Sequence, residues 1–180
     1  LNIPIGVNVQ FNDIKAEMAI AKTCGADFIR IEVFVENVFT PQGFVEASSA
    51  EVMRELGDYG FGKPKLLIDL QSKGTYQINN QVTIEQHLSK VESFGGDAII
   101  ITGAGTGKST PLDVVENLKS KTDLPVLVGS GVNSKTIKKT LGIADGVIIG
   151  SALKYDGNAH NKINPKAAEN VIKQIWGWIK

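Results

Sequence analysis

Charged and polar side chains interrupt strand-like apolar segments of the chain, in positions suited to acid–base chemistry. In the segment 28–33, three aliphatic residues alternate with Arg30 and Glu32, which therefore share the opposite face of a predicted strand. The same alternation in two other predicted strands places Asn8 and Asp69 on the corresponding face. Lys73 follows just beyond the strand that contains Asp69. We predict Asp69 or Glu32 as the proton-transfer group, with the other three orienting a substrate. The alternative is a buried ion-pair network that only satisfies itself.

Two later apolar runs end in glycine and serine, a composition suited to holding a phosphate group. The run 125–128 is followed by Gly129, Ser130 and Gly131, and the run 146–149 by Gly150 and Ser151. Glycine lets the backbone approach an oxyanion closely, and serine adds a hydroxyl donor. Two consecutive loops of this kind are typical of the phosphate site of a (β/α) barrel. The alternative is that each Gly-Ser pair only makes a tight exit from its strand.

A third loop, over 102–109, is rich in glycine and ends in Gly-Lys-Ser. A P-loop with this ending would need glycine at position 102, where the chain has Thr102, so NTP hydrolysis is not predicted. The loop is still expected to line the active site. Its candidate pocket residues are Thr102, Gly103, Gly105 and Lys108, of which Lys108 could contact a phosphate.

Strand-like and helix-like segments alternate along the whole chain, which predicts an α/β fold with a parallel sheet covered by helices. Helices are expected where apolar residues recur at helical spacing between capping and glycine signals. Strands are predicted near 4–9, 28–33, 65–71, 98–102, 125–129 and 146–149, and helices near 13–23, 49–56, 83–94, 111–121, 133–141 and 164–179.

The number of units determines which α/β architecture fits. A closed (β/α)8 TIM barrel needs eight strand–helix units in about 250 residues, and about six are visible here. Because the phosphate-type loops follow the last two strands, we expect a single barrel domain over 1–180 that lacks about two N-terminal units. The competing architecture is a doubly wound open sheet, but no G-x-G-x-x-G fingerprint follows the first strand.

The composition of the chain limits the classes of molecule that it is expected to bind. Nineteen basic residues balance nineteen acidic ones, so no electrostatic signature for nucleic acid is present. No apolar run approaches the ~20 residues that span a membrane, which predicts a soluble, cytoplasmic protein that binds a small molecule or another protein.

Cys24 is expected to be a buried structural thiol and His87 to face solvent. Neither His87 nor His160 has a further ligand at metal-binding spacing, so no metal site and no cofactor are predicted.

Several motifs match one family in order along the chain. They are Gly6-Val7-Asn8-Val9 with Asn12-Asp13, the segment 25–30, Gln42-Gly43, the loop 102–107, and the segments 129–132 and 150–157. Over essentially all 180 residues the chain resembles the BtpA/SgcQ family. This resemblance implies a phosphate-binding TIM barrel with further residues upstream of the first strand. One member gives the family its name as a factor for photosystem I biogenesis.

The resemblance and the residues together lead to two functional expectations. The first is a barrel enzyme that binds a small phosphorylated metabolite or inorganic phosphate, an isomerase or lyase using proton transfer. The second is a non-catalytic assembly or biogenesis factor with a vestigial anion site. Gln10-Phe11 and Lys73-Gly74 stand where the family typically has Leu-Arg and Lys-His, which suggests a different substrate. Self-association as a homo-oligomer is expected if open strand edges need cover.

Overall fold

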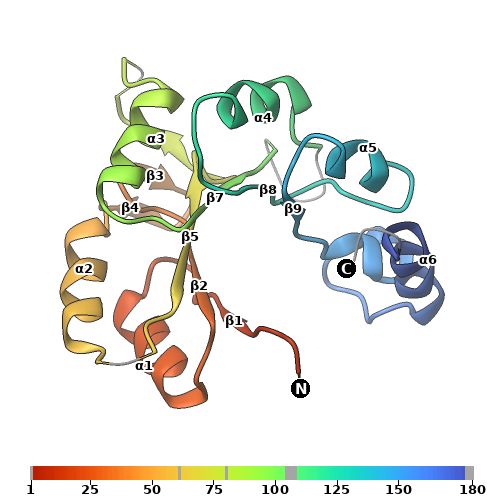
Figure 1. Cartoon of the computed structure of the whole chain (residues 1–180), viewed down its shortest axis with the longest axis horizontal. Helices are drawn as coiled ribbons and strands as arrows, with labels where there is room; N and C mark the ends of the chain where they lie inside the picture. Colours follow the sequence, from red (N-terminus) through yellow and green to blue (C-terminus); the bar gives the residue numbers. More distant parts are fainter. Residues whose placement is uncertain (1, 61, 80, 104–108, 177–180) are drawn as a thin grey trace. The chain divides into compact units, whose positions relative to one another are not determined.

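The structure is a computed structural model that describes the chain except residues 1, 61, 80, 104–108 and 177–180 (Figure 1). Its main sheet has six strands in the hydrogen-bonded order β1-β2-β5-β7-β8-β9. The order follows the chain, as in a (β/α) barrel, and lacks the reversal that defines a doubly wound sheet. The predicted α/β fold is therefore confirmed. The chain divides into two compact units, 1–99 and 100–180, so the single, incomplete barrel domain stays a prediction.

The first unit alternates parallel strands with helices, as its sequence pattern predicts. Strand β2 pairs in parallel with both β1 and β5. Aliphatic side chains of β2 and β5, among them Ile29, Ile31, Leu66 and Ile68, form the centre of its core. The elements are β1 (Gly6–Val7), α1 (Ile14–Cys24), β2 (Phe28–Ile31), α2 (Ser49–Asp58), β5 (Lys65–Leu70) and α3 (Ile84–Ser93).

Side-chain caps fix the ends of two helices in this unit. The carboxylate of Asp13 accepts a hydrogen bond from the Ala16 amide at the start of α1, and Gly25 ends that helix in the left-handed conformation. At the start of α3, Thr83 and Gln86 form a reciprocal capping box. These local signals explain why the sequence located both helices to within one residue.

A small antiparallel sheet, which the sequence analysis did not predict, also belongs to the first unit. Its strands are β3 (Val38–Thr40), β4 (Gly43–Val45) and β6 (Tyr76–Gln77). Strand β3 lies in the middle, so that Phe39 is paired with Phe44 on one side and Tyr76 on the other. Unlike β8 and β9, which lie within the apolar runs 125–128 and 146–149, these strands lie in no continuous apolar run that would mark them in the sequence.

The second unit carries the two glycine–serine loops. Strand β8 (Val126–Val128) pairs in parallel with β9 (Gly146–Val147), and β7 (Ala98–Ile101) spans the division between the units. Its helices are α4 (Leu112–Lys119), α5 (Ile137–Leu141) and α6 (Pro165–Ile175), with 3-10 turns η1 (Ser151–Leu153) and η2 (Tyr155–Gly157). Helix α5 begins four residues later than predicted, because Asn133 and Thr136 form a hydrogen-bonded turn before it.

Two side chains differ from their predicted environments. Cys24 is exposed, because it is the last residue of α1 and lies beyond the buried positions Ile14, Met18 and Ala21. His87 is buried, because it lies beside Leu88 on the inward stripe of α3 and does not face solvent. Both errors come from assigning a helix face from a short pattern with few apolar markers.

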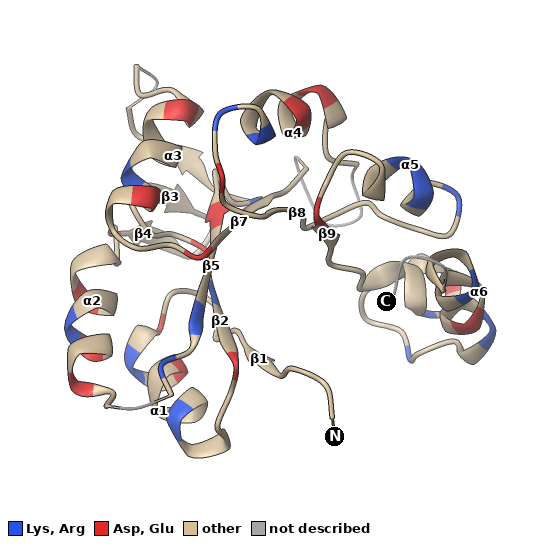
Figure 2. Cartoon of the chain, viewed as in Figure 1, with Lys and Arg blue, Asp and Glu red and all other residues tan. Residues whose placement is uncertain are grey.

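Most helices carry charges of both signs, whereas α5 carries only lysines (Figure 2). Figure 2 shows that α2, α3, α4 and α6 each carry both acidic and basic residues. Within the described part of the chain, no helix combines the length and apolar character needed to cross a membrane.

Candidate functional site

The strongest polar contact of the first unit joins two strands, as the alternation of β2 and β5 predicts. The Arg30 guanidinium donates from Nε and Nη2 to the two carboxylate oxygens of Asp69, at 2.9 and 2.8 Å. Asp69 is fully buried and also accepts a hydrogen bond of 2.9 Å from the Ser72 hydroxyl. Burial alone would lower the pKa of Arg30, but the hydrogen bonds and charge of Asp69 raise it. Both oxygens of Asp69 are therefore engaged in holding Arg30 and Ser72.

Glu32 lies beside this pair and is less constrained. One of its oxygens accepts a hydrogen bond of 3.3 Å from the Gln10 side chain, and the other, Oε2, has no hydrogen-bond partner among the described residues. Burial and then the charge of Asp69 raise the pKa of Glu32, while Arg30 and Lys73 act in the opposite direction. A buried carboxyl group with a raised pKa and a spare oxygen is suited to proton transfer.

The structure brings four of the five predicted catalytic residues into one electrostatic cluster: Arg30, Glu32, Asp69 and Lys73. Asn8 lies next to them, but its side-chain amide donates to the Arg30 carbonyl at 2.9 Å and so ties β1 to β2. The side chains thus lie together within the first unit, while their catalytic roles stay a prediction.

Glu17 belongs to the same environment and was missed by the sequence analysis. It lies on the inward face of α1 and is only 1% exposed. Burial is the largest cause that raises its pKa, to about 8, and Glu32 adds to the effect. The signal was present: Ile14, Glu17, Met18 and Ala21 follow the spacing of a single helix face, so an acidic residue stands within an apolar stripe.

In the second unit, Ser130 is buried and its hydroxyl has a defined structural role. The Ser130 oxygen accepts a hydrogen bond of 2.6 Å from the Gly103 amide, and the Thr110 hydroxyl lies 3.4 Å away. Thr110 also donates to the carbonyl groups of Ile101 and Ser130. Ser130 therefore anchors the start of the glycine-rich loop, which the sequence pattern did not reveal.

The glycines that follow β8 and β9 differ in their surroundings and backbone conformation. A methyl group on Gly129 would lie 2.6 Å from a side-chain carbon of Ile100 and 3.0 Å from one of Thr102, so a side chain there would collide with β7 and its loop. Gly131 has a φ of 74°, in the left-handed region that favours glycine. Gly150 has open space around it and directly precedes Ser151, where η1 begins.

A small cavity lies beside the first of these loops. Its volume is about 140 Å³, and its lining includes Ser130, Gly131, Thr136, Lys139 and Thr110. Hydroxyl groups, a glycine backbone and an ammonium group are the donors that recognise a phosphate. Gly150 and Ser151 are not part of this lining, although they follow the neighbouring parallel strand β9.

The remaining predicted pocket residues divide into two groups. Thr102 is half-buried and Gly103 is buried at the start of the glycine-rich loop. Gly105 and Lys108 lie outside the described residues. Across the described residues, no group of three or more His, Cys, Asp or Glu side chains is arranged to hold a metal ion.

Parallel strands that alternate with helices and end in polar loops define an α/β protein of the (β/α)-barrel class, and solved structures agree. The fold is similar to that of KGPDC from Streptococcus mutans, with a TM-score of 0.59 and 16% identity over 99% of this chain and 74% of that one. It is also similar to orotidine 5′-monophosphate decarboxylase from Sulfolobus solfataricus, with a TM-score of 0.57 and 16% identity over 98% of this chain and 75% of that one.

Sequence comparison gives the family. The chain belongs to the BtpA family, whose model matches residues 1–176. It is 35% identical to an uncharacterised protein of Pyrococcus abyssi, over 97% of this chain and 66% of that protein. It is 33% identical to the photosystem I biogenesis protein BtpA of Synechocystis, over 90% of this chain and 56% of that protein. The chain thus spans between about half and two thirds of the length of these relatives.

Proposed function

We propose that the chain binds a small phosphorylated metabolite through the loops that follow β8 and β9. The observation that carries this proposal is the cavity next to Ser130 and Gly131, because hydroxyl-bearing residues, Gly131 and Lys139 line it together. Gly150 and Ser151 follow the adjacent strand and offer the same chemistry. Two proteins with a similar fold are named after a phosphate ester: thiamine phosphate pyrophosphorylase from Pyrococcus furiosus and orotidine 5′-monophosphate decarboxylase.

The first unit supplies the proposed proton-transfer chemistry. Asp69 is occupied on both oxygens by Arg30 and Ser72, so its role is to hold Arg30 in place. Glu32 keeps one oxygen without a hydrogen-bond partner among the described residues, and its pKa is raised by burial toward the range of a general acid–base group. We therefore assign proton transfer, in an isomerase or lyase reaction, to Glu32 in preference to Asp69.

A charge reversal at the cavity tests the phosphate site. Lys139→Glu places a carboxylate in the lining, whereas Lys138→Glu makes the same change one residue earlier on α5, outside it. In thermal-shift titrations with inorganic phosphate, sugar phosphates and nucleotides, we expect one phosphorylated class to stabilise the wild-type chain. The Lys139 variant should bind that class at least ~10-fold more weakly, since a lost charge-assisted contact is worth about 1.5–3 kcal/mol. Equal binding by both variants would contradict the proposal.

A protein-assembly role is the second candidate, and the small sheet of the first unit favours it. Phe39, Phe44 and Tyr76 are paired across its three strands and are 52%, 51% and 67% exposed. Aromatic side chains in a row on an exposed sheet are typical of a surface that contacts another protein. The phenyl rings of Phe39 and Phe44 also stack edge to face at 5.7 Å.

One pair of variants separates the two candidates. Glu32→Gln removes the proposed acid–base group and should abolish turnover while leaving phosphate binding and any assembly role intact. Phe39→Ser should leave turnover intact and weaken an assembly role. Complementation in a strain that lacks the protein, scored for both variants, tells which activity the cell requires.

A further inference from the structure

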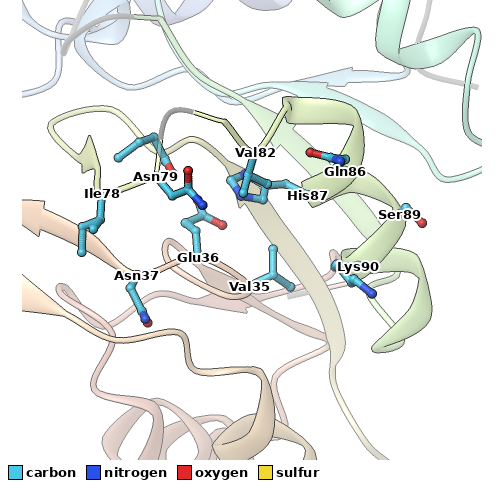
Figure 3. Close-up of a pocket in the computed structure, with 11 residues that line it drawn as sticks. Val35, Glu36, Asn37, Ile78, Asn79, Val82, Gln86, His87, Ser89 and Lys90 are labelled. Atoms are coloured by element: carbon cyan, nitrogen blue, oxygen red, sulfur yellow. The ribbon is translucent and has the colours of Figure 1, made fainter.

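The first unit contains a cavity of its own, separate from the one beside Ser130. It is lined by residues with buried polar atoms that the proposed function does not use. Its volume is about 530 Å³, within the ~300–1,000 Å³ typical of small-molecule pockets. It lies between the segment 35–37, the segment 77–79 and the inward side of α3 (Figure 3). Figure 3 shows Glu36 in the middle of this lining, with Val82 and His87 on one side and Asn37 and Ile78 on the other.

Three side chains of this lining hold polar atoms without a hydrogen-bond partner among the described residues. They are both carboxylate oxygens of Glu36, Nε2 of Gln77 and Nδ1 of His87. Glu36 and His87 are each only 5% exposed. Native proteins satisfy nearly all such atoms, because leaving one unpaired is costly, and more so for a charged group. These atoms are therefore the donors and acceptors that a polar ligand in the cavity would engage.

The electrostatics of the cavity show what Glu36 lacks. Burial is the largest cause that raises the pKa of Glu36, to about 7, and the charge of Asp69 adds to it, while nearby backbone amides act in the opposite direction. Burial lowers the pKa of His87, which favours the neutral form of its ring. Lys90 is the basic residue of the described lining, and it is exposed on α3. No side chain of the described lining donates a hydrogen bond to Glu36.

The unpaired atoms specify a ligand of complementary pattern. A carboxylate with two open oxygens accepts two neighbouring N–H groups, and the Gln77 amide nitrogen can only donate. We propose that this cavity binds a small molecule that presents an amidine-type pair of N–H donors to Glu36 and a carbonyl acceptor to Gln77. The N–H pair can belong to a neutral amino-heterocycle or to an organic cation. Val35, Ile78 and Val82 supply apolar walls for its ring.

Calorimetric titration of the whole chain with two probes tests this inference. Isocytosine is neutral and carries the N–H pair together with a carbonyl group, whereas benzamidine is a cation with the N–H pair alone. 1,3-Dimethyluracil has no N–H donor and serves as the negative probe. We expect isocytosine or benzamidine to bind and dimethyluracil not to bind. Isocytosine alone would identify a neutral heterocycle, and benzamidine alone a cation.

Matched variants connect the binding to Glu36. Glu36→Gln should weaken binding at least 10-fold, and Glu46→Gln, the same change at an exposed position of the same unit, should leave it unchanged. Gln77→Leu gives an independent readout, because it should weaken isocytosine binding several-fold and spare benzamidine. Melting curves of each variant verify that it is folded. Binding of neither probe to the wild-type chain, or undiminished binding by the folded Glu36 variant, would overturn the proposal. Phosphate binding through Lys139 is measured separately and can hold in either case.

Discussion

The two compact units carry candidate sites of opposite construction. The first unit places ionisable groups inside its core: the carboxyl groups of Glu17, Glu32 and Asp69 and the guanidinium of Arg30 lie around β2. The second unit places neutral hydroxyl groups and glycine backbone after β8 and β9. The lysine of its cavity, Lys139, is an exposed residue of α5. Buried charge is costly, whereas backbone and hydroxyl groups cost little.

This difference indicates where each kind of chemistry can occur. Acid–base catalysis needs a pKa moved toward neutrality, and only burial or a close charge provides that. Anion binding needs donors that can approach the ligand closely, and glycine loops provide those without a buried charge. We therefore attribute proton transfer to the first unit and phosphate recognition to the second, and each experiment below tests one side of this contrast.

The largest effect is expected from breaking the buried ion pair. Arg30→Ala leaves Asp69 buried and unpaired, which should lower the free energy of unfolding by about 3–5 kcal/mol. Lys65→Ala removes an exposed pair with Asp97 in the same unit and should lower the free energy of unfolding far less. Urea denaturation of both variants measures the difference. Equal losses would show that the burial of Asp69 has no energetic consequence.

A dependence on pH should distinguish the carboxyl groups of the two units. The folded chain keeps a proton on Glu17 up to about pH 8, whereas the unfolded chain releases it near its ordinary pKa of 4.5. Stability from this group is thus complete below pH 4.5 and is lost as pH rises toward 8, by about 1.4 kcal/mol per pH unit. Glu17→Gln should reduce the slope, measured by urea denaturation from pH 5 to 8, and the exposed Glu46→Gln should not. The slope that is left comes from Glu32 and Glu36, because burial raises the pKa of both.

Asp145 of the second unit should show the opposite sign. Burial alone would raise its pKa, but Lys119 and the Val126 amide lower it below the ordinary value. Its contribution is therefore present above the unfolded pKa and is lost only as pH falls through the folded pKa.

A Glu17 variant whose stability still falls between pH 5 and 8 as steeply as the wild type would contradict the assignment of the slope to Glu17.

A smaller loss is expected from adding one methyl group at the end of β8. Gly129→Ala would bring the new methyl group to 2.6 Å from Ile100, and relief of this contact should cost about 1–3 kcal/mol. Gly150→Ala adds the same group after β9, where nothing lies within 4 Å, and should change stability by less than about 1 kcal/mol. Thermal melting compares the two. Equal melting temperatures would mean that Gly129 is not needed for packing.

The sequence predicted the features that periodicity and capping determine. All six strands of the main sheet and all six α-helices were located, and the alternation in 28–33 placed Arg30 and Glu32 on the face that meets Asp69. The small sheet was missed because its strands lie in no continuous apolar run, unlike β8 and β9. The roles of Glu36 and Gln77 also could not be predicted, since they depend on which loops meet.

The hydrogen-bond partners of individual side chains also could not be predicted from the sequence. The Gly-Ser pattern correctly marked the ends of β8 and β9, but only the structure shows that the Ser130 hydroxyl accepts from the Gly103 amide. Residues 27 positions apart in the sequence form this bond, and no local pattern encodes it. Phosphate binding by Gly129, Ser130, Gly131, Gly150 and Ser151 stays a prediction until it is measured.

Amide chemical-shift mapping tests that central claim most directly. A nitrogen-15-labelled chain is titrated with inorganic phosphate, and the backbone amide signals of both units are followed. We predict saturable changes at Gly131, Gly150 and Ser151, with the amides of Arg30 and Glu32 unmoved. Saturable changes confined to the first unit, or none in the segments 129–131 and 150–151, would contradict the attribution of phosphate recognition to the second unit.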